Sequence, residues 1–183
     1  MLRNTATSWG TVSRAFHWIL GLAIIGMLAY GWWMNHMVPR PDRFFHRSIH
    51  ADIGYVVLLL MVIRLIWRGM NPLPAPSADA SRRERLAARV NHWALYVVTI
   101  AVALFGWAHS GANKRDYADW FGLFRVPQFT STDKATADFF EYLHIYGAYL
   151  LIALVVIHIL AALYHHFVKS DNVTSRMVRG GAG

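Results

Sequence analysis

Residues 141–166 read EYLHIYGAYLLIALVVIHILAALYHH, and this stretch decides the fold. It is long and apolar enough to cross a bilayer, for which about 20 apolar residues suffice. It also carries two histidines, His144 and His158, fourteen residues apart. On a helix this spacing falls about 40° short of four turns, so both imidazoles share one face and lie about 21 Å apart along the axis. The stretch therefore predicts a transmembrane helix with one histidine toward each membrane face.

Small residues follow both histidines at the third and fourth positions: Gly147 and Ala148 after His144, and Ala161 and Ala162 after His158. These positions lie on the same side of a helix as the histidine. A flat macrocycle bound through an axial histidine overhangs the neighbouring turns, so it needs such a bare patch. Close helix packing in membranes uses the same small residues. The coincidence of spacing and small residues favours two haems stacked across a membrane.

Composition supports a membrane protein and limits how a haem can be held. The 183 residues are 56% hydrophobic and 14% aromatic, with a net charge of +8, which fits one apolar domain with basic flanks better than a nucleic-acid binder. The chain contains no cysteine, which excludes disulfides, iron–sulfur clusters, thiolate zinc sites and the covalent attachment of c-type haem. Any haem must be bound noncovalently, through histidine or methionine.

Four apolar segments predict an all-α fold, an integral membrane antiparallel four-helix bundle that forms a single transmembrane domain over residues 1–183. The spans are expected at about 15–34, 48–67, 90–109 and 142–166. The first is too long for the apolar region of a signal peptide and is interpreted as a retained helix. Residues 110–140 form the longest connection; an interfacial segment is expected there, and Ser131–Asp133 is a helix start signal.

Basic residues predict the orientation. Eleven of the 18 lysines and arginines lie in the terminal segments and the 64–90 region, and seven lie on the opposite side of the predicted membrane. Because cytoplasmic loops carry the excess of basic residues, both termini are expected in the cytoplasm.

The same topology divides the ten histidines into five on each side. His17, His92, His158, His165 and His166 fall on the cytoplasmic side, and His36, His46, His50, His109 and His144 on the outer side. Two further histidines precede a small residue by four positions, since Gly21 follows His17 and Gly54 follows His50. Their depths match those of the histidines on the fourth span. We therefore predict that His17 and His158 bind a haem on the cytoplasmic side, and that His50 and His144 bind one on the outer side.

Other histidines fit less well. His92 is followed at these positions by Leu95 and Tyr96, which leave no bare patch. A lone histidine near a membrane interface is also often an amphipathic residue with its tip among the headgroups. Arg64 lies fourteen residues after His50 and near the same face. It is a candidate partner of a haem propionate, and snorkelling to the headgroups is the alternative.

Several of these motifs together resemble a known family over almost the whole chain. They are RAFHWIL at 14–20, RSIHADIGY at 47–55, MVIRLIWR at 61–68 and the stretch from 141 to 172 that ends in HHFVKSDN. In this order they resemble the bacterial di-haem cytochrome b561 family, whose members include superoxide:ubiquinone oxidoreductases. The resemblance implies two haem b groups with His17, His50, His144 and His158 as axial ligands of the haem iron. It also implies electron transfer to the quinone pool in the bacterial inner membrane, with ubiquinone as acceptor.

We therefore expect an oxidoreductase that passes electrons from superoxide at the outer face to ubiquinone, with membrane lipid around it and no nucleic-acid partner. Arg40, Arg43 and Arg47 precede His50, and we expect them, together with Lys114 and Arg115, to raise the arrival rate of a small anion. Binding of lipid headgroups is the alternative role of the three arginines. His165, seven residues after His158, is a candidate quinone site. No residue is assigned a catalytic role. Two alternatives stay open: a cytochrome b subunit of a membrane dehydrogenase or hydrogenase, and a haem-free metal-binding or transport bundle.

Overall fold

The computed structural model describes residues 1–77, 79–113 and 119–180. Four long helices dominate it: α1 (Thr11–His36), α2 (Arg43–Gly69), α3 (Arg82–Ala112) and α4 (Lys134–Phe167). All four are long and apolar enough to cross a membrane. They contain the four predicted spans, and they confirm the predicted all-α transmembrane fold. Each extends beyond the apolar segment, so polar turns continue the helices at both ends.

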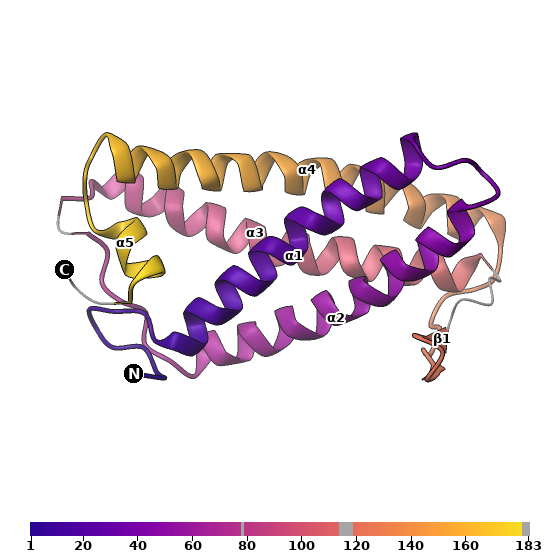
Figure 1. The fold of residues 1–183 in the computed structure, drawn as a ribbon, viewed down its shortest axis with the longest axis horizontal. Helices are drawn as coiled ribbons and strands as arrows, with labels where there is room; N and C mark the ends of the chain where they lie inside the picture. The colour runs from indigo at the N-terminus through magenta and orange to yellow at the C-terminus, as the bar shows by residue number, and fades with distance from the viewer. Residues whose placement is uncertain (78, 114–118, 181–183) are drawn as a thin grey trace.

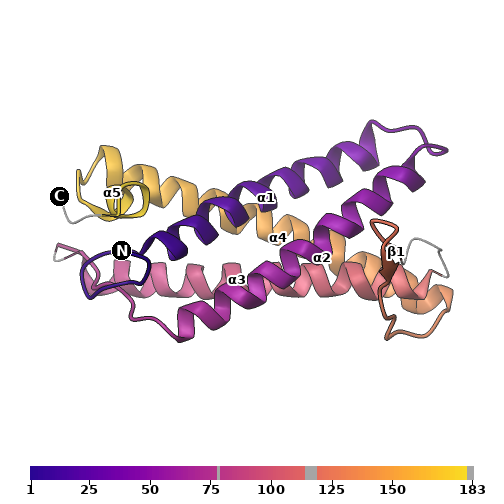
Figure 2. The ribbon, with the colours of Figure 1, turned by 60° about the horizontal axis from the view of Figure 1, so that its bottom comes forward.

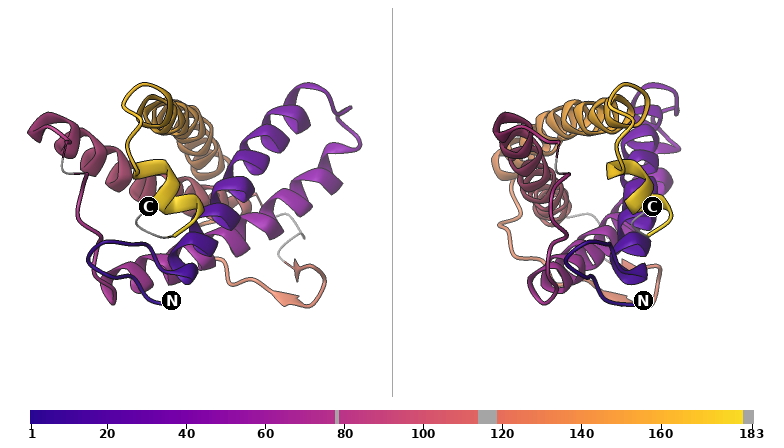
Figure 3. Two further views of the ribbon diagram at one scale, coloured as in Figure 1. Left: turned by 60° about the vertical axis from the view of Figure 1, so that its left-hand side comes forward. Right: turned by 90° about the vertical axis from the view of Figure 1, so that its left-hand side faces the viewer.

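The helices run antiparallel in chain order. In the described part of the chain, α1 packs on α2, α2 on α3, and α3 on α4. Seen along the bundle, the four helices stand around a common centre (Figure 3). Both termini lie at one end, which we call the termini end, and the connections after α1 and α3 lie at the other, which we call the loop end (Figure 1). The bundle therefore has two ends at which histidines of different helices can meet.

The core is small, and most large apolar side chains face outward. Leu20 is fully buried, and Val57, Met61 and Tyr96 complete a cluster contributed by α1, α2 and α3. In contrast, many leucines, isoleucines and valines of the helices are exposed, Leu59 by 60% and Leu160 by 59%. An apolar exterior of this kind is stable only against lipid, since the hydrocarbon chains take the place of a protein core.

The helix ends are fixed by local signals. Ser81 and Glu84 form a capping box at the start of α3, with the Ser81 side chain accepting from the Glu84 N–H. Asp133 caps α4 by accepting from the Thr136 N–H, which confirms the predicted start signal. A short helix, α5 (Val173–Val178), folds back on α4 at the termini end (Figure 1).

A two-stranded antiparallel hairpin lies at the loop end (Figure 2). It pairs β1 (Asp119–Trp120) with β2 (Phe124–Arg125), and Trp120 stands opposite Phe124. It occupies the connection in which the sequence predicted an interfacial segment.

Candidate functional site

The loop end brings His50 of α2 and His144 of α4 together. Their ring centroids are 6.0 Å apart, with an angle of 84° between the planes. Two imidazoles that bond one metal from opposite sides, each at about 2 Å, place their centroids roughly 6 Å apart. The two rings therefore already have the separation that ligation of one metal by both requires.

This pair lines a cavity of about 230 Å³ between all four helices. Gly31, Gly54, Gly106 and Ala148 are among its lining residues, so parts of the wall are bare backbone. The part-buried rings and these small wall residues fit a flat macrocycle that needs close approach to the helices.

Two glycines on neighbouring helices leave the space that the imidazole rings occupy. A Cβ added at Gly106 of α3 would lie 3.0 Å from Cε1 and Nδ1 of His144, and one at Gly31 of α1 would lie 3.2 Å from Cε1 of His50. Both distances are shorter than ordinary contacts, so each ring rests in a space that a side chain would fill. Gly147 has a different role, because its added Cβ would lie 2.8 Å from Cγ2 of Val102. It serves the packing of α3 on α4.

Gly31 and Gly106 were not among the predicted site residues, although the sequence contains a signal for them. Gly31 lies fourteen residues after His17, and Gly106 fourteen residues after His92. This is the spacing that joins His144 to His158, so both glycines lie on the histidine-bearing faces of their own helices.

The Nδ1 atoms of the two imidazoles differ in their surroundings. Nδ1 of His144 donates to the carbonyl oxygen of Val102 at 2.8 Å. Such a bond fixes the tautomer that leaves Nε2 free for a metal. Nδ1 of His50 is buried, and no described residue accepts from it. The Tyr30 ring stacks on the His50 ring with 6.1 Å between their centroids, and the Tyr30 hydroxyl forms a hydrogen bond with Nδ1 of His46 at 2.9 Å.

The termini end brings three histidines together where the sequence predicted two. The centroids of His17 (α1) and His158 (α4) are 6.0 Å apart at 60°. His92 of α3 lies 5.5 Å from His158 at 65°. The predicted pair thus meets at the same separation as the pair at the loop end, and His92 joins it as a third imidazole.

Arg64 reaches the same cluster from α2. Its Nη2 lies 3.4 Å from Nδ1 of His17, and its guanidinium stands over the Tyr96 ring at 5.2 Å. A guanidinium can only donate, so this contact needs a hydrogen on Nε2 of His17. An imidazole that bonds a metal through Nε2 carries its hydrogen on Nδ1 instead. Arg64 must therefore leave His17 when that ring acts as a ligand, which would free it for an anionic partner.

His165 lies near the termini end on α4 and is held by the segment before α5. Its Nδ1 donates to Oδ2 of Asp171 at 2.5 Å, and the two side chains are only 20% and 8% exposed. The bond fixes the ring and leaves Nε2 as its second polar atom.

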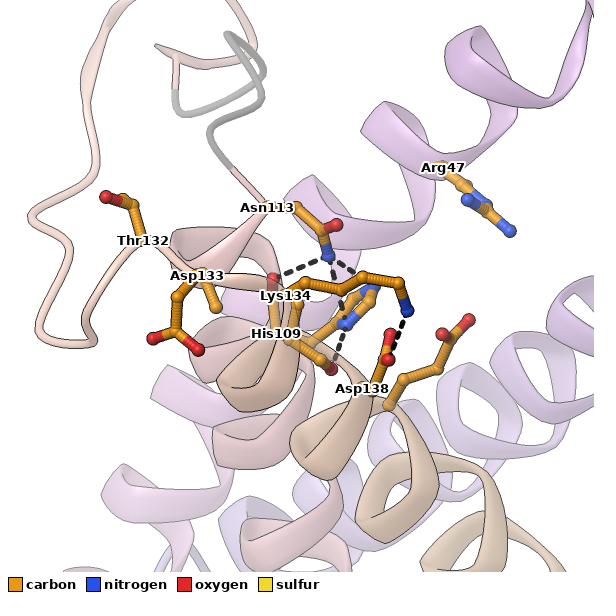
Figure 4. A pocket seen from close by; sticks show the side chains of 10 residues that line it. Arg47, His109, Asn113, Thr132, Asp133, Lys134 and Asp138 are labelled. Carbon is orange, nitrogen blue, oxygen red and sulfur yellow. Dashed lines mark hydrogen bonds and ion pairs between the residues drawn. The ribbon is translucent and has the colours of Figure 1, made fainter.

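A second hollow of about 510 Å³, which we call the vestibule, opens at the loop end (Figure 4). It shares Arg47, His109 and Glu141 with the cavity of His50 and His144, so it leads from the surface toward that pair. Lys134 in its wall pairs with Asp138, whereas Arg47 makes no ion pair among the described residues.

Acidic groups in the vestibule oppose the attraction of an anion. The Thr136 N–H lowers the pKa of Asp133 to about 2, so this carboxylate is charged at any working pH. Of the three arginines predicted to attract a donor, only Arg47 lines the vestibule. Arg43 instead donates from Nε to the carbonyl oxygen of Val38 at 2.8 Å. Lys114 and Arg115, which were expected to add to this field, lie outside the described residues.

Comparison with known proteins agrees with this architecture. A profile of the prokaryotic cytochrome b561 family matches residues 8–180. Cytochrome b561 homolog 2 of Escherichia coli is 36% identical over 177 residues, covering 96% of this chain and 93% of the relative. A probable superoxide oxidase CybB of Yersinia pestis is 29% identical, over 88% of this chain and 90% of the relative. Cytochrome b561 homolog 1 of Escherichia coli is 26% identical, over 88% of this chain and 92% of the relative. The chain therefore belongs to the prokaryotic cytochrome b561 family, a family of membrane electron-transfer proteins for which b-type haem is implied.

Proposed function

We propose that this protein is a di-haem oxidoreductase that takes electrons from superoxide at the loop end and delivers them to ubiquinone. The observation that carries the proposal is the pair of histidine contacts, each at 6.0 Å, on one bundle. His50 with His144 would hold one haem b, and His17 with His158 the other. Held by these imidazoles, each haem b would supply reversible one-electron oxidation and reduction.

The number of protein ligands supports haem over a bare metal ion. Among the described residues, no group of three or more histidine, cysteine, aspartate or glutamate side chains is placed to hold a metal ion. The two imidazoles proposed as ligands at each site suit a metal whose other ligands come from a macrocycle. The small residues around His50 and His144 would leave room for its plane.

We assign the loop end to the outer face of the bacterial inner membrane. The termini end and its connection carry eleven of the 18 basic residues, which favours the cytoplasm for that end. The vestibule would then open to the outside, and Arg47 would draw a small anion toward the cavity of His50 and His144. Electrons would cross the distance between His144 and His158, about 21 Å for fourteen residues.

The termini end would serve the quinone. Two superoxide anions each lose one electron and leave as dioxygen, while one ubiquinone gains two electrons and two protons. His165 would hold a proton on Nε2 and donate it to a quinone oxygen, because Asp171 occupies its Nδ1. Arg64, released from His17, would bind a haem propionate.

The proposal is tested by supplying purified protein with superoxide at a steady rate and a soluble ubiquinone analogue. We expect superoxide loss above the spontaneous rate, with one quinol formed for two superoxide anions consumed. Loss of superoxide without quinol would contradict the proposal. A haem-containing protein that is inactive alone but copurifies stoichiometrically with a dehydrogenase or hydrogenase would favour the subunit alternative.

A further inference from the structure

The hairpin formed by residues 119–125 has a strained turn that is fastened to α2. Phe121 and Gly122 have φ angles of 47° and 72°, and the Leu123 N–H donates to the Trp120 carbonyl at 2.8 Å. A bulky residue rarely adopts a positive φ, so its surroundings must hold it there. Trp120, the residue before Phe121, fastens the turn to α2, because its Nε1 donates to the backbone oxygen of Asp52 at 3.3 Å.

The position of Asp52 gives the depth of this attachment. Asp52 lies nine residues after Arg43, the first residue of α2, or about 14 Å along the helix. The 27 residues of α2 span about 40 Å, whereas a hydrocarbon core is about 30 Å thick. If α2 is centred, Asp52 lies about 8 Å inside the hydrocarbon edge. The hairpin thus meets α2 within the membrane boundary and does not stand above it.

The polarity of the hairpin matches that boundary. Phe121, Leu123 and Phe124 at its tip are 52%, 72% and 57% exposed. Arg125 and Asp119 at its base form an ion pair at 3.6 Å. Amphipathic helices bury their apolar face about 5–10 Å deep at the boundary of headgroups and acyl chains, and an apolar tip above a charged base suits the same boundary.

The hairpin projects from the loop end away from the four helices (Figures 1 and 3). Its exposed apolar tip therefore adds to an apolar exterior that already requires lipid. We propose that the hairpin is a membrane anchor, whose tip inserts among the acyl chains of the leaflet at the loop end and which is held in that position by Asp52. This inference does not depend on the proposed function, since neither haem nor electron transfer enters it.

The absence of cysteine in the whole chain makes a direct test possible. Leu123→Cys provides a single labelling site for an environment-sensitive fluorophore in proteoliposomes. Thr132→Cys, which lies in the vestibule, is the aqueous control, and Leu59→Cys on the exposed face of α2 is the lipid control. We expect spin-labelled lipid to quench the label at Leu123→Cys severalfold more than iodide does, with a shallow spin label more effective than a deep one.

Quenching by iodide as strong as at Thr132→Cys would overturn the anchor. Protection from both quenchers would also overturn it, because the tip would then be covered by protein. In the Leu123→Cys background, Trp120→Phe removes the Nε1 donor to the Asp52 backbone oxygen and should move the label toward iodide. A label depth equal to that of Leu123→Cys alone would overturn the role of this contact.

Discussion

His144 donates a hydrogen bond from Nδ1 to the carbonyl oxygen of Val102, one turn before Gly106 on α3. The bond and the missing side chain at Gly106 belong together, because only a bare backbone lets the ring approach this closely. Across the cavity, the missing side chain at Gly31 of α1 likewise leaves room for the His50 ring. The two imidazoles at the loop end are thus positioned by neighbouring helices as well as by their own.

Gly106→Ala tests this positioning. The new Cβ would lie 3.0 Å from two atoms of the His144 ring, so the ring must shift and its bond to Val102 must weaken. We expect haem content at the loop end to fall and the apparent haem affinity to drop by about 10–100-fold. Haem titration of the apoprotein measures it. Gly26→Ala is the matched control, since nothing lies within 4 Å of its added Cβ. Equal affinity in both variants would refute the positioning role.

Larger substitutions separate haem clearance from helix packing. Gly54 lines the cavity, and its added Cβ meets only Met27 Cε at 3.9 Å, so Gly54→Leu should fill space and exclude haem while the bundle stays folded. Gly147→Leu drives into Val102 and should lower thermal stability, by about 1–3 kcal/mol or more. Thermal unfolding in detergent, followed beside haem content, distinguishes the two effects. The account fails here if Gly54→Leu keeps both haems.

Arg47→Gln should lower the rate of superoxide consumption several-fold at low salt and much less at high salt, because ions screen a surface charge. Arg43→Gln is the control: it removes the same charge one turn away, outside the vestibule, from a side chain bound to Val38. Initial rates over a range of ionic strength provide the measurement. A larger loss in Arg43→Gln would place the donor elsewhere on the loop end.

His165→Ala should slow quinone reduction by about 100-fold, at the lower end of what general acid catalysis contributes, while both haems remain. Asp171→Asn should give a smaller loss of rate. The amide can still accept from the His165 ring, but it no longer stabilises a positive charge on that ring. Haem reduction by superoxide, followed before quinone is added, should be normal in both variants. Wild-type rates of quinone reduction in His165→Ala would remove this residue from the quinone site.

The sequence was sufficient to predict the four helices and the two histidine pairs that meet in the structure, because both predictions depend on periodicity along one chain segment. Fourteen-residue spacing identified His144 and His158, and matching depth identified His17 and His50. The sequence was not sufficient to predict contacts between helices. The prediction of bare patches used only small residues on each histidine's own helix. It therefore assigned Gly147 to a haem patch, although Gly147 packs on Val102, and it did not include Gly31 and Gly106.

The same limit explains His92 and Arg64. Leu95 and Tyr96 removed His92 from consideration, yet rotation of α3 in the bundle carries it to 5.5 Å from His158. For Arg64, spacing predicted the correct face of α2 but could not show that the guanidinium contacts His17 and Tyr96. Such contacts depend on how the helices are rotated against one another, which no single segment encodes.

The central claim is that four histidines hold two haems, and the pyridine haemochrome assay combined with reduced-minus-oxidised spectra tests it most directly. Wild-type protein should contain two haem b per chain, both low-spin. His50→Ala and His144→Ala should each lose the haem at the loop end, and His17→Ala and His158→Ala the haem at the termini end, while His92→Ala keeps both. A single haem in the wild-type protein, or a haem lost in His92→Ala and kept in His17→Ala, would contradict the account.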